Sequence, residues 1–132
     1  MKTKYRAWIE EYKELCRVLS IDLVNDSFCV LPTAELEGGG QVEIKGLDKL
    51  EEYININDDN GTEVYLHDII NVIEKTIEAD KVITGIIIYD EGFGAYMVDF
   101  PYWGESRTLS DFIDSGLLVV GNEHQNINLL GI

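Results

Sequence analysis

The chain has 132 residues, 45% hydrophobic and 27% charged, a size and composition typical of a globular protein with one core. Its 25 acidic and 10 basic side chains give a net charge of −15, which disfavours direct nucleic-acid binding because such a surface repels phosphate backbones. The N-terminal sequence lacks the apolar segment of a secretory signal, and no window reaches the roughly 18 apolar residues of a membrane span. The sequence therefore predicts a cytoplasmic protein without membrane contact.

The first residues support two interpretations. Apolar side chains recur at helical spacing over residues 5–19, which is typical of an amphipathic helix. The overlapping stretch 16–32 instead contains two β-rich runs on either side of Asn25 and Asp26, which are both turn formers. For this second stretch we expect a hairpin.

The two cysteines, Cys16 and Cys29, lie in apolar surroundings without a Cys-x-x-Cys spacing or a neighbouring histidine cluster. A zinc site would need about four ligands, and a disulfide suits an oxidising compartment. We interpret both cysteines as buried, reduced thiols, and we predict no metal or other cofactor.

Three successive glycines, Gly38 to Gly40, predict a mobile loop because glycine has no side chain to pack and much backbone freedom. We place a candidate subdomain boundary after this loop, which would divide the single domain 1–132 into 1–46 and 47–132. The stretch 47–54 has apolar residues at three- and four-residue steps, and it predicts one or two helical turns.

The stretch 55–72, NINDDNGTEVYLHDIINV, could be a cation site or a turn. Aligned on an EF-hand loop with Gly61 at position 6, Ile56 falls at position 1 and His67 at position 12, where a carboxylate and a glutamate are required. The pair Asn60-Gly61 instead supplies the two positive-φ residues of a type I′ turn. A turn is therefore favoured, followed by an extended run over 64–72 with a bend at His67 and Asp68.

His67 beside Asp68 has the composition of an oriented general base. No nucleophile or further ligand is near in the sequence. We therefore expect these two side chains to serve the structure, and we predict no catalytic residue.

The last third of the chain predicts more strands. Residues 82–100 predict a hairpin with a turn at 91–94. Thr108 precedes Asp111 by three residues, a capping-box spacing that suits a short helical turn, and residues 116–122 predict a buried strand.

Aromatic residues are concentrated near the end of the predicted hairpin. Base stacking on nucleic acid normally accompanies a basic groove, which this acidic chain does not predict. We therefore interpret the aromatic residues as core and interface, and the cluster Pro101, Tyr102 and Trp103 is our candidate interaction surface.

Three blocks of the chain, KYRAW at 4–8, DDNGTEVYLHDIINV at 58–72 and VVGNEHQNINLL at 119–130, resemble in order the motifs of the YopX family of bacteriophages and prophages of Gram-positive bacteria. The matching positions are Arg6, Ala7, Trp8, Asp58, Asn60, Gly61, Glu63, Tyr65, Asp68, Ile69, Gly121, Asn122, Asn126, Leu129 and Leu130. Three positions depart from the family pattern: His67 and Asn55 stand where glycine is usual, and Ile127 where proline is usual.

The resemblance implies a mainly β fold with minor α content. It would have a small SH3-like barrel in the C-terminal half and an N-terminal β-hairpin subdomain. It also favours strand over helix for residues 5–19. Closing several short strands into a barrel would remove their exposed edges, which agrees with the many turn signals.

The resemblance implies a phage or prophage protein, in a bacterial host cell, with no established activity. We expect a non-enzymatic interaction or assembly module whose partner is a second copy of the chain or another host or phage protein. One alternative is an acidic protein that imitates nucleic acid and inhibits a basic host protein. A second is a metal-dependent enzyme using Asp58, Asp59, Asp68 and Asp90.

Overall fold

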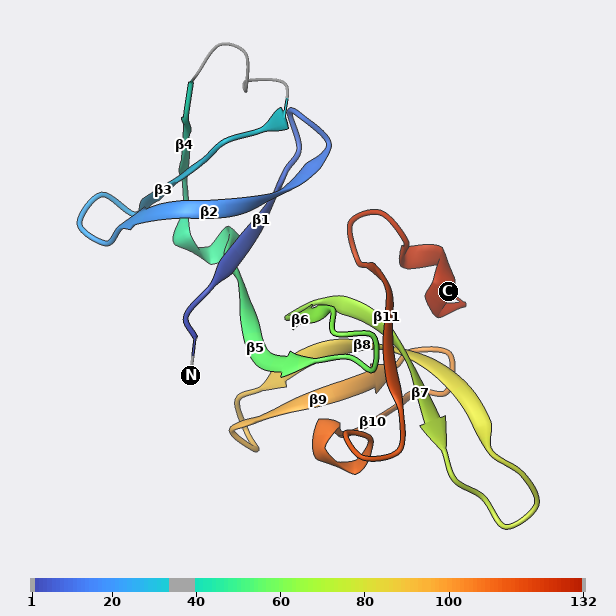
Figure 1. The fold of residues 1–132 in the computed structure, drawn as a ribbon. Helices are drawn as coiled ribbons and strands as arrows, with labels where there is room; N and C mark the ends of the chain where they lie inside the picture. Colours follow the sequence, from blue (N-terminus) through green and yellow to red (C-terminus); the bar gives the residue numbers. More distant parts are fainter. Residues whose placement is uncertain (1, 34–39, 132) are drawn as a thin grey trace. The chain divides into compact units, whose positions relative to one another are not determined.

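A computed structural model describes residues 2–33 and 40–131 and shows a mainly β protein with short 3₁₀ turns (Figure 1). The chain forms two compact units, Met1–Tyr53 (unit 1) and Ile54–Ile132 (unit 2). The division falls inside a strand, whereas the sequence suggested a boundary at residue 46. In the described ranges, no helix has the length and hydropathy needed to cross a membrane.

Unit 1 is an antiparallel sheet with the strand order β4-β3-β2-β1, and the first residues of β5 lie beside β1. Its elements are β1 (Tyr5–Ile9), β2 (Glu14–Asp22), β3 (Ser27–Val30), β4 (Val42–Lys45), the 3₁₀ turn η2 (Leu47–Lys49) and the start of β5 (Glu51–Asn57). The chain leaves unit 1 along β5.

The helical interpretation of residues 5–19 is wrong, and the strand that the family resemblance favours is confirmed. β1 and β2 pair from Arg6↔Arg17 to Ile9↔Glu14. The chain reverses at Lys13, whose φ is 51°. Side chains alternate between the two faces of a strand, and this alternation explains why the segment is extended. Ala7 and Ile9 of β1 face the core, and Cys16 of β2 packs in the same cluster.

The hairpin expected within 16–32 is confirmed by the pairing of β2 with β3. Its turn is held by Asp22, whose Oδ1 accepts the N–H groups of Val24 and Asn25. The sequence did not predict β4. Gly38 and Gly39, where a mobile loop was expected, lie outside the described residues.

Unit 1 has its own apolar core beneath this sheet. Buried and partly buried side chains from β1 to β4, from η2 and from the adjoining turns pack together: Ala7, Ile9, Tyr12, Cys16, Val18, Phe28, Val30, Val42, Ile44, Leu47 and Leu50. The predicted helical turns at 47–54 are reduced to the one 3₁₀ turn η2, after which the chain is extended.

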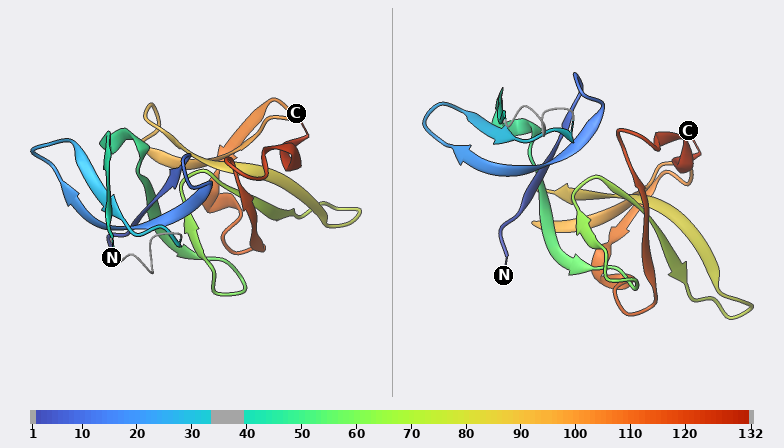
Figure 2. Two further views of the ribbon diagram at one scale, coloured as in Figure 1. Left: turned by 90° about the horizontal axis from the view of Figure 1, so that it is seen from above. Right: turned by 45° about the horizontal axis from the view of Figure 1, so that its top comes forward.

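Unit 2 contains an antiparallel sheet with the order β10-β9-β8-β7-β11, and β6 follows the end of β5. Its elements are β6 (Glu63–Tyr65), β7 (Asp68–Glu74), β8 (Lys81–Asp90), β9 (Ala95–Phe100), β10 (Glu105–Thr108), η3 (Leu109–Asp111), β11 (Leu117–Asn122) and η4 (Ile127–Leu130). The β7–β8 hairpin, lime to yellow, projects from the rest of this sheet (Figure 2). In the described part of the chain this order is open, so the SH3-like barrel stays a prediction.

The predicted hairpin over 82–100 is confirmed as β8 and β9. The capping box at Thr108 is wrong in detail, because Thr108 precedes η3 without a side-chain hydrogen bond to it. β11 is only half buried: Leu117 and Asn122 are buried, but Leu118 and Val120 are exposed. β11 belongs to an antiparallel sheet, and such a sheet can turn one face to solvent.

The core of unit 2 is larger than that of unit 1. One cluster lies between the sheet and η3, where the rings of Phe100 and Phe112 meet edge to face at 5.8 Å. A smaller cluster joins Ile69 and Ile86 to Leu130 of η4. The C-terminal turn is therefore tied to the middle of the sheet by burial.

Candidate interaction surface

Tyr102 and Trp103 stand on the tight turn that joins β9 to β10. The N–H groups of Trp103 and Gly104 both donate to the carbonyl of Phe100, at 3.0 and 2.9 Å, and Gly104 adopts a φ of 67°. This left-handed glycine closes the turn at little steric cost. The two aromatic side chains remain 67% and 63% exposed, and their rings meet edge to face at 5.1 Å.

Two hollows of unit 2 have Trp103 in their lining. One, of about 190 Å³, is lined by Val82, Ile83, Thr84, Tyr102, Trp103, Leu129, Leu130 and Gly131. The other, of about 270 Å³, is lined by Glu74, Lys81, Ile83, Trp103 and Glu105. We call these residues together the Trp103 surface. It combines exposed aromatic and aliphatic groups with a charged border, the composition of a protein-binding patch.

The structure thus places two of the predicted surface residues, Tyr102 and Trp103, fully at the surface and Pro101 half-buried beside them. Sequence reasoning missed Val82 and Leu129. Val82 belongs to β8 and Leu129 to η4, so only tertiary folding brings them to the aromatic pair. Leu129 was singled out as a family-motif residue, but nothing in its neighbourhood predicted this location.

Unit 2 carries most of the negative charge. Residues 54–132 contain 3 basic and 14 acidic side chains, a net −11, whereas residues 1–53 contain 7 basic and 11 acidic side chains, a net −4. Two of the three cations of unit 2 are paired: Arg107 with Glu74 at 2.7 Å and Lys75 with Asp80 at 3.0 Å. The electrostatic field of unit 2 is therefore strongly negative.

Asp58, the first residue of the middle motif, is a structural acceptor. Its Oδ1 accepts the N–H groups of Asn60 and Thr62, and its Oδ2 that of Val119, each at 2.9 Å. Burial alone would raise the pKa of this carboxyl group, but the amide donors of Val119, Thr62 and Asn60 lower it below its ordinary value. Asp58 thus stays ionised while joining the turn to β11.

The predicted turn at Asn60-Gly61 exists, but its type is not I′. The N–H of Gly61 donates to the carbonyl of Asp58 at 2.9 Å, and Gly61 has a φ of 83°, while Asn60 is not in the left-handed region. This pattern fits a type I turn followed by a left-handed glycine. The Asp58 carboxylate explains the difference, because it holds the Asn60 amide in the turn.

Asn55 and His67, which replace the family's usual glycines, both have positive φ, 64° and 70°. The family's glycines therefore coincide with left-handed backbone that this chain adopts with larger side chains. The backbone of His67 forms hydrogen bonds with two other segments. Its N–H donates to the carbonyl of Ile87, and its carbonyl accepts the N–H of Glu123. Its Nδ1 lies 3.2 Å from a carboxylate oxygen of Glu123.

The remaining middle-motif residues stabilise the bend between β6 and β7. The buried Asp68 accepts the N–H of Tyr65 at 2.8 Å, and the Tyr65 hydroxyl lies 3.4 Å from the carboxylate of Glu63. Ile69 is fully buried in the core. The bend predicted at His67 and Asp68 is therefore confirmed.

The C-terminal motif forms a loop that is held by hydrogen bonds among its own residues. Asn122 accepts the N–H groups of His124 and Gln125, and Asn126 accepts that of Asn122. Gly121 allows this packing, since a Cβ there would lie 2.5 Å from Oδ1 of Asn126. Ile127 opens η4, a position that suits the proline usual in the family.

In unit 1, the motif residues lie on β1. Ala7 is fully buried opposite Cys16, and the Trp8 indole N–H donates to Glu10 at 2.7 Å. Nε of Arg6 lies 3.0 Å from Oε1 of the buried Glu51. These contacts assign the first motif to the sheet and its core.

The four carboxylates of the metal-enzyme hypothesis are distributed over separate turns. Asp59 accepts the Leu117 N–H at 3.3 Å, and Asp90 accepts that of Phe93 at 3.0 Å. Among the residues that the structure describes, none of the four belongs to a group of three or more His, Cys, Asp or Glu ligand atoms within 4.8 Å of one another. Each instead has a backbone amide as a partner.

The fold and the surface define a class of protein: mainly β, built of antiparallel sheets, with its sequence motifs in turns and core and an aromatic patch at one turn. The family model described as YopX protein matches residues 4–131. The chain therefore belongs to the YopX family, which confirms the resemblance noted in the sequence.

One solved structure has a similar fold over the whole chain. The crystal structure of protein EF1440 from Enterococcus faecalis has a TM-score of 0.61 and 21% identity, with 98% of this chain and 99% of that chain covered. At this identity the likeness shows the fold alone. No curated protein matches the chain.

Proposed function

We propose that this protein is a non-enzymatic interaction or assembly module, encoded by a phage or prophage and acting in the bacterial cytoplasm through its Trp103 surface. The observation that carries the proposal is the pair Tyr102 and Trp103, packed edge to face at 5.1 Å and mostly exposed. Its partner is a protein: a second copy of the chain or a host or phage protein.

The energetics of exposure support a docking role. Val82 is 66% exposed beside the two aromatic side chains, so three large apolar groups face water at one location. Trp and Tyr dominate binding energy in protein interfaces, since each buries a large rigid surface at low entropic cost. The two hollows that Trp103 lines give a partner side chain somewhere to pack.

The SH3-like closure of unit 2 is part of this proposal. A small barrel is a rigid support on which short turns present binding groups, and the β9–β10 turn is such a turn. In this interpretation, the motif residues maintain the support and the Trp103 surface binds.

The test is capture from a host lysate with three proteins: the wild type, Trp103→Ala and Phe93→Ala. Phe93 is the matched control, because it is 77% exposed on the β8–β9 turn of the same unit and does not line either Trp103 hollow. We expect one protein partner to be retained by the wild type and by Phe93→Ala and lost by Trp103→Ala. Equal capture by all three proteins would contradict the proposal.

A second candidate is supported by the charge of unit 2. A net −11 on 79 residues allows the surface to imitate the phosphate charges of nucleic acid and to occupy a basic host protein. Such binding is weakened by salt, since exposed charges are screened. Capture of basic DNA-handling proteins at low salt only, unaffected by Trp103→Ala, would favour this candidate over the first.

A further inference from the structure

Strand β2 changes partner halfway along its length. Its first half, Glu14 to Arg17, pairs with β1, and its second half, Val18 to Asp22, pairs with β3, with a bulge between Val18 and Ser20. β1 leaves β2 before Val18 and pairs with β5 through Tyr5 and Arg6. Within the described residues, the β1-facing edge of Val18–Asp22 therefore has no partner strand.

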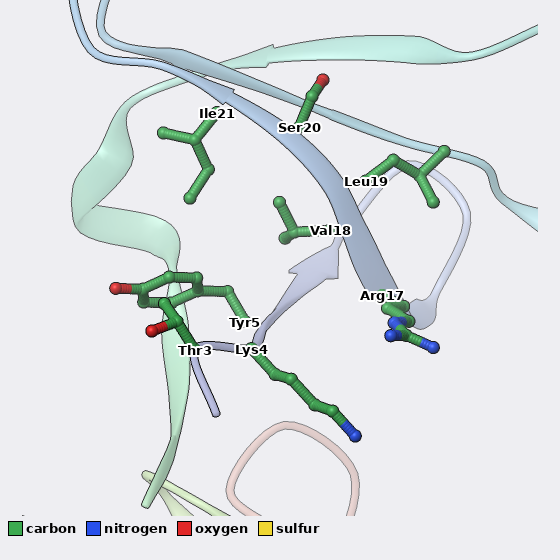
Figure 3. Close-up of a pocket in the computed structure, with 8 residues that line it drawn as sticks. All are labelled: Thr3, Lys4, Tyr5, Arg17, Val18, Leu19, Ser20 and Ile21. Atoms are coloured by element: carbon green, nitrogen blue, oxygen red, sulfur yellow. The ribbon is translucent and has the colours of Figure 1, made fainter. Parts of the chain in front are cut away.

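A hollow of about 350 Å³ lies along this edge. It is lined by Thr3, Lys4 and Tyr5 on one side and by residues 17–21 of β2 on the other. Figure 3 shows Tyr5 facing Val18 and Ile21 across it, with Arg17 toward the other end. The hollow is thus the slot left where two neighbouring strands diverge.

The slot offers the two components of strand recognition. An open edge supplies main-chain donors and acceptors, which an added strand satisfies. Apolar side chains beside it supply specificity, and Leu19 and Ile21 are 49% and 36% exposed. The nearby tip of the β2–β3 hairpin is also apolar, with Leu23 81% and Val24 92% exposed.

The charge of the slot identifies the kind of occupant. Among the described residues that line it, the charged ones are Lys4 and Arg17, and none carries a carboxylate, although the chain has 25 acidic residues. The Lys4 ammonium lies 5.6 Å from the centre of the Tyr53 ring, and the exposed Arg17 forms no ion pair with any residue that the structure describes. Arg17 at one end of the apolar slot, with a second cation, Lys4, in the same lining, favours a carboxylate on the ligand.

We propose that unit 1 binds an extended peptide segment of another protein by β-strand addition to the Val18–Asp22 edge, with an acidic side chain of the segment toward Lys4 and Arg17. This site belongs to unit 1, so it is separate from the Trp103 surface. An experiment that contradicts one of the two proposed sites does not contradict the other.

The experiment uses the whole ¹⁵N-labelled chain and two synthetic peptides, acetyl-EVTVEVT-amide and acetyl-KVTVKVT-amide. The readouts are amide chemical shifts and hydrogen exchange. We expect the acidic peptide to protect amides within Val18–Asp22 and the lysine peptide to bind about tenfold more weakly or worse, because like charges oppose it. Binding of neither peptide, equal binding of both, or protection confined to other residues would overturn the proposal.

Matched variants test the role of the charges. Lys4→Gln with Arg17→Gln should abolish the preference for the acidic peptide, whereas Lys13→Gln, an exposed cation on the β1–β2 turn that does not line the slot, should keep it. Unchanged amide shifts elsewhere in unit 1 establish that the variants fold. If the Val18–Asp22 amides become protected without peptide as protein concentration rises, the occupant is a second copy and the proposal is wrong.

Discussion

Oδ2 of Asp58 accepts a 2.9 Å hydrogen bond from the backbone N–H of Val119, 61 residues further along the chain. The same carboxylate holds two amides of its own turn. One buried side chain thus connects the middle and C-terminal motifs of the family. Its role is to join the 58–62 turn to β11.

Asp58→Asn should destabilise the protein by about 2 kcal/mol, since hydrogen bonds to a charged acceptor are worth about 1.5–3 kcal/mol and the amide offers one acceptor oxygen where the carboxylate offers two. Urea unfolding measures this. The control is Asp114→Asn, an exposed residue of the same unit, which should change stability by less than about 0.5 kcal/mol. Equal effects of the two substitutions would show that Asp58 is dispensable.

The contribution of Asp58 should depend on pH in one direction. Its pKa is lowered in the folded protein, so its stabilising effect is complete above the ordinary pKa of Asp and is lost as the pH falls through the folded value. The wild type should therefore lose its advantage over Asp58→Asn on acidification. Urea midpoints of both proteins from neutral into acidic pH test this, and a gap independent of pH would contradict it.

Gly121→Ala should be strongly destabilising although it adds one methyl group. The new Cβ would lie 2.5 to 2.7 Å from side-chain atoms of Asn126, including its own Cβ. Overpacking of this kind costs about 1–3 kcal/mol. Asn126→Ala removes the side-chain amide but keeps the Cβ, so the double variant Gly121→Ala, Asn126→Ala should recover part of the loss in a thermodynamic cycle. Strict additivity would mean that the two residues do not interact.

Arg6→Met should cost about 3 kcal/mol, because it removes a cation that is paired with a buried carboxylate. Nε of Arg6 lies 3.0 Å from Oε1 of Glu51, and their side chains are 13% and 4% exposed. Lys13→Met removes a second pair, with Glu10, whose side chains are 70% and 72% exposed, and should cost less than about 1 kcal/mol. Thermal unfolding of the two variants distinguishes the pairs, and a reversed order would refute the assignment.

The two thiols should react at different rates. Burial raises the pKa of Cys16, and the nearby Glu14 carboxylate adds to the effect, whereas Cys29 is only half-buried. Since the thiolate is the reactive form, iodoacetamide at neutral pH should label Cys29 first in the native protein. Mass spectrometry of digested samples measures both rates. Faster labelling of Cys16 would contradict the described packing of unit 1.

Sequence reasoning predicted the parts of the fold that local patterns determine. The β8–β9 hairpin and the bend at His67 follow from alternation and turn residues. Helical spacing misled at residues 5–19, because a short amphipathic pattern fits either structure and the pairing of β1 with β2 decided the outcome. The type of turn at Gly61 was missed because Asp58, whose partner Val119 is remote, sets it.

The candidate site was predictable only in part. Tyr102 and Trp103 are adjacent and aromatic, so composition indicated them. Val82, Ile83 and Leu129 join them through tertiary folding, and the slot beside β2 exists only because β1 stops pairing with β2 before Val18. Neither arrangement leaves a signal at fixed spacing in the sequence.

The most direct test of the central claim, that the Trp103 surface binds a protein, is a hydrogen-exchange footprint of the captured partner on the whole chain. Our account predicts that the partner protects the amides of 82–84, 102–104 and 129–131, and that the exposed turn at 91–94 exchanges as in the free protein. Protection of other segments, with 102–104 unchanged, would contradict it.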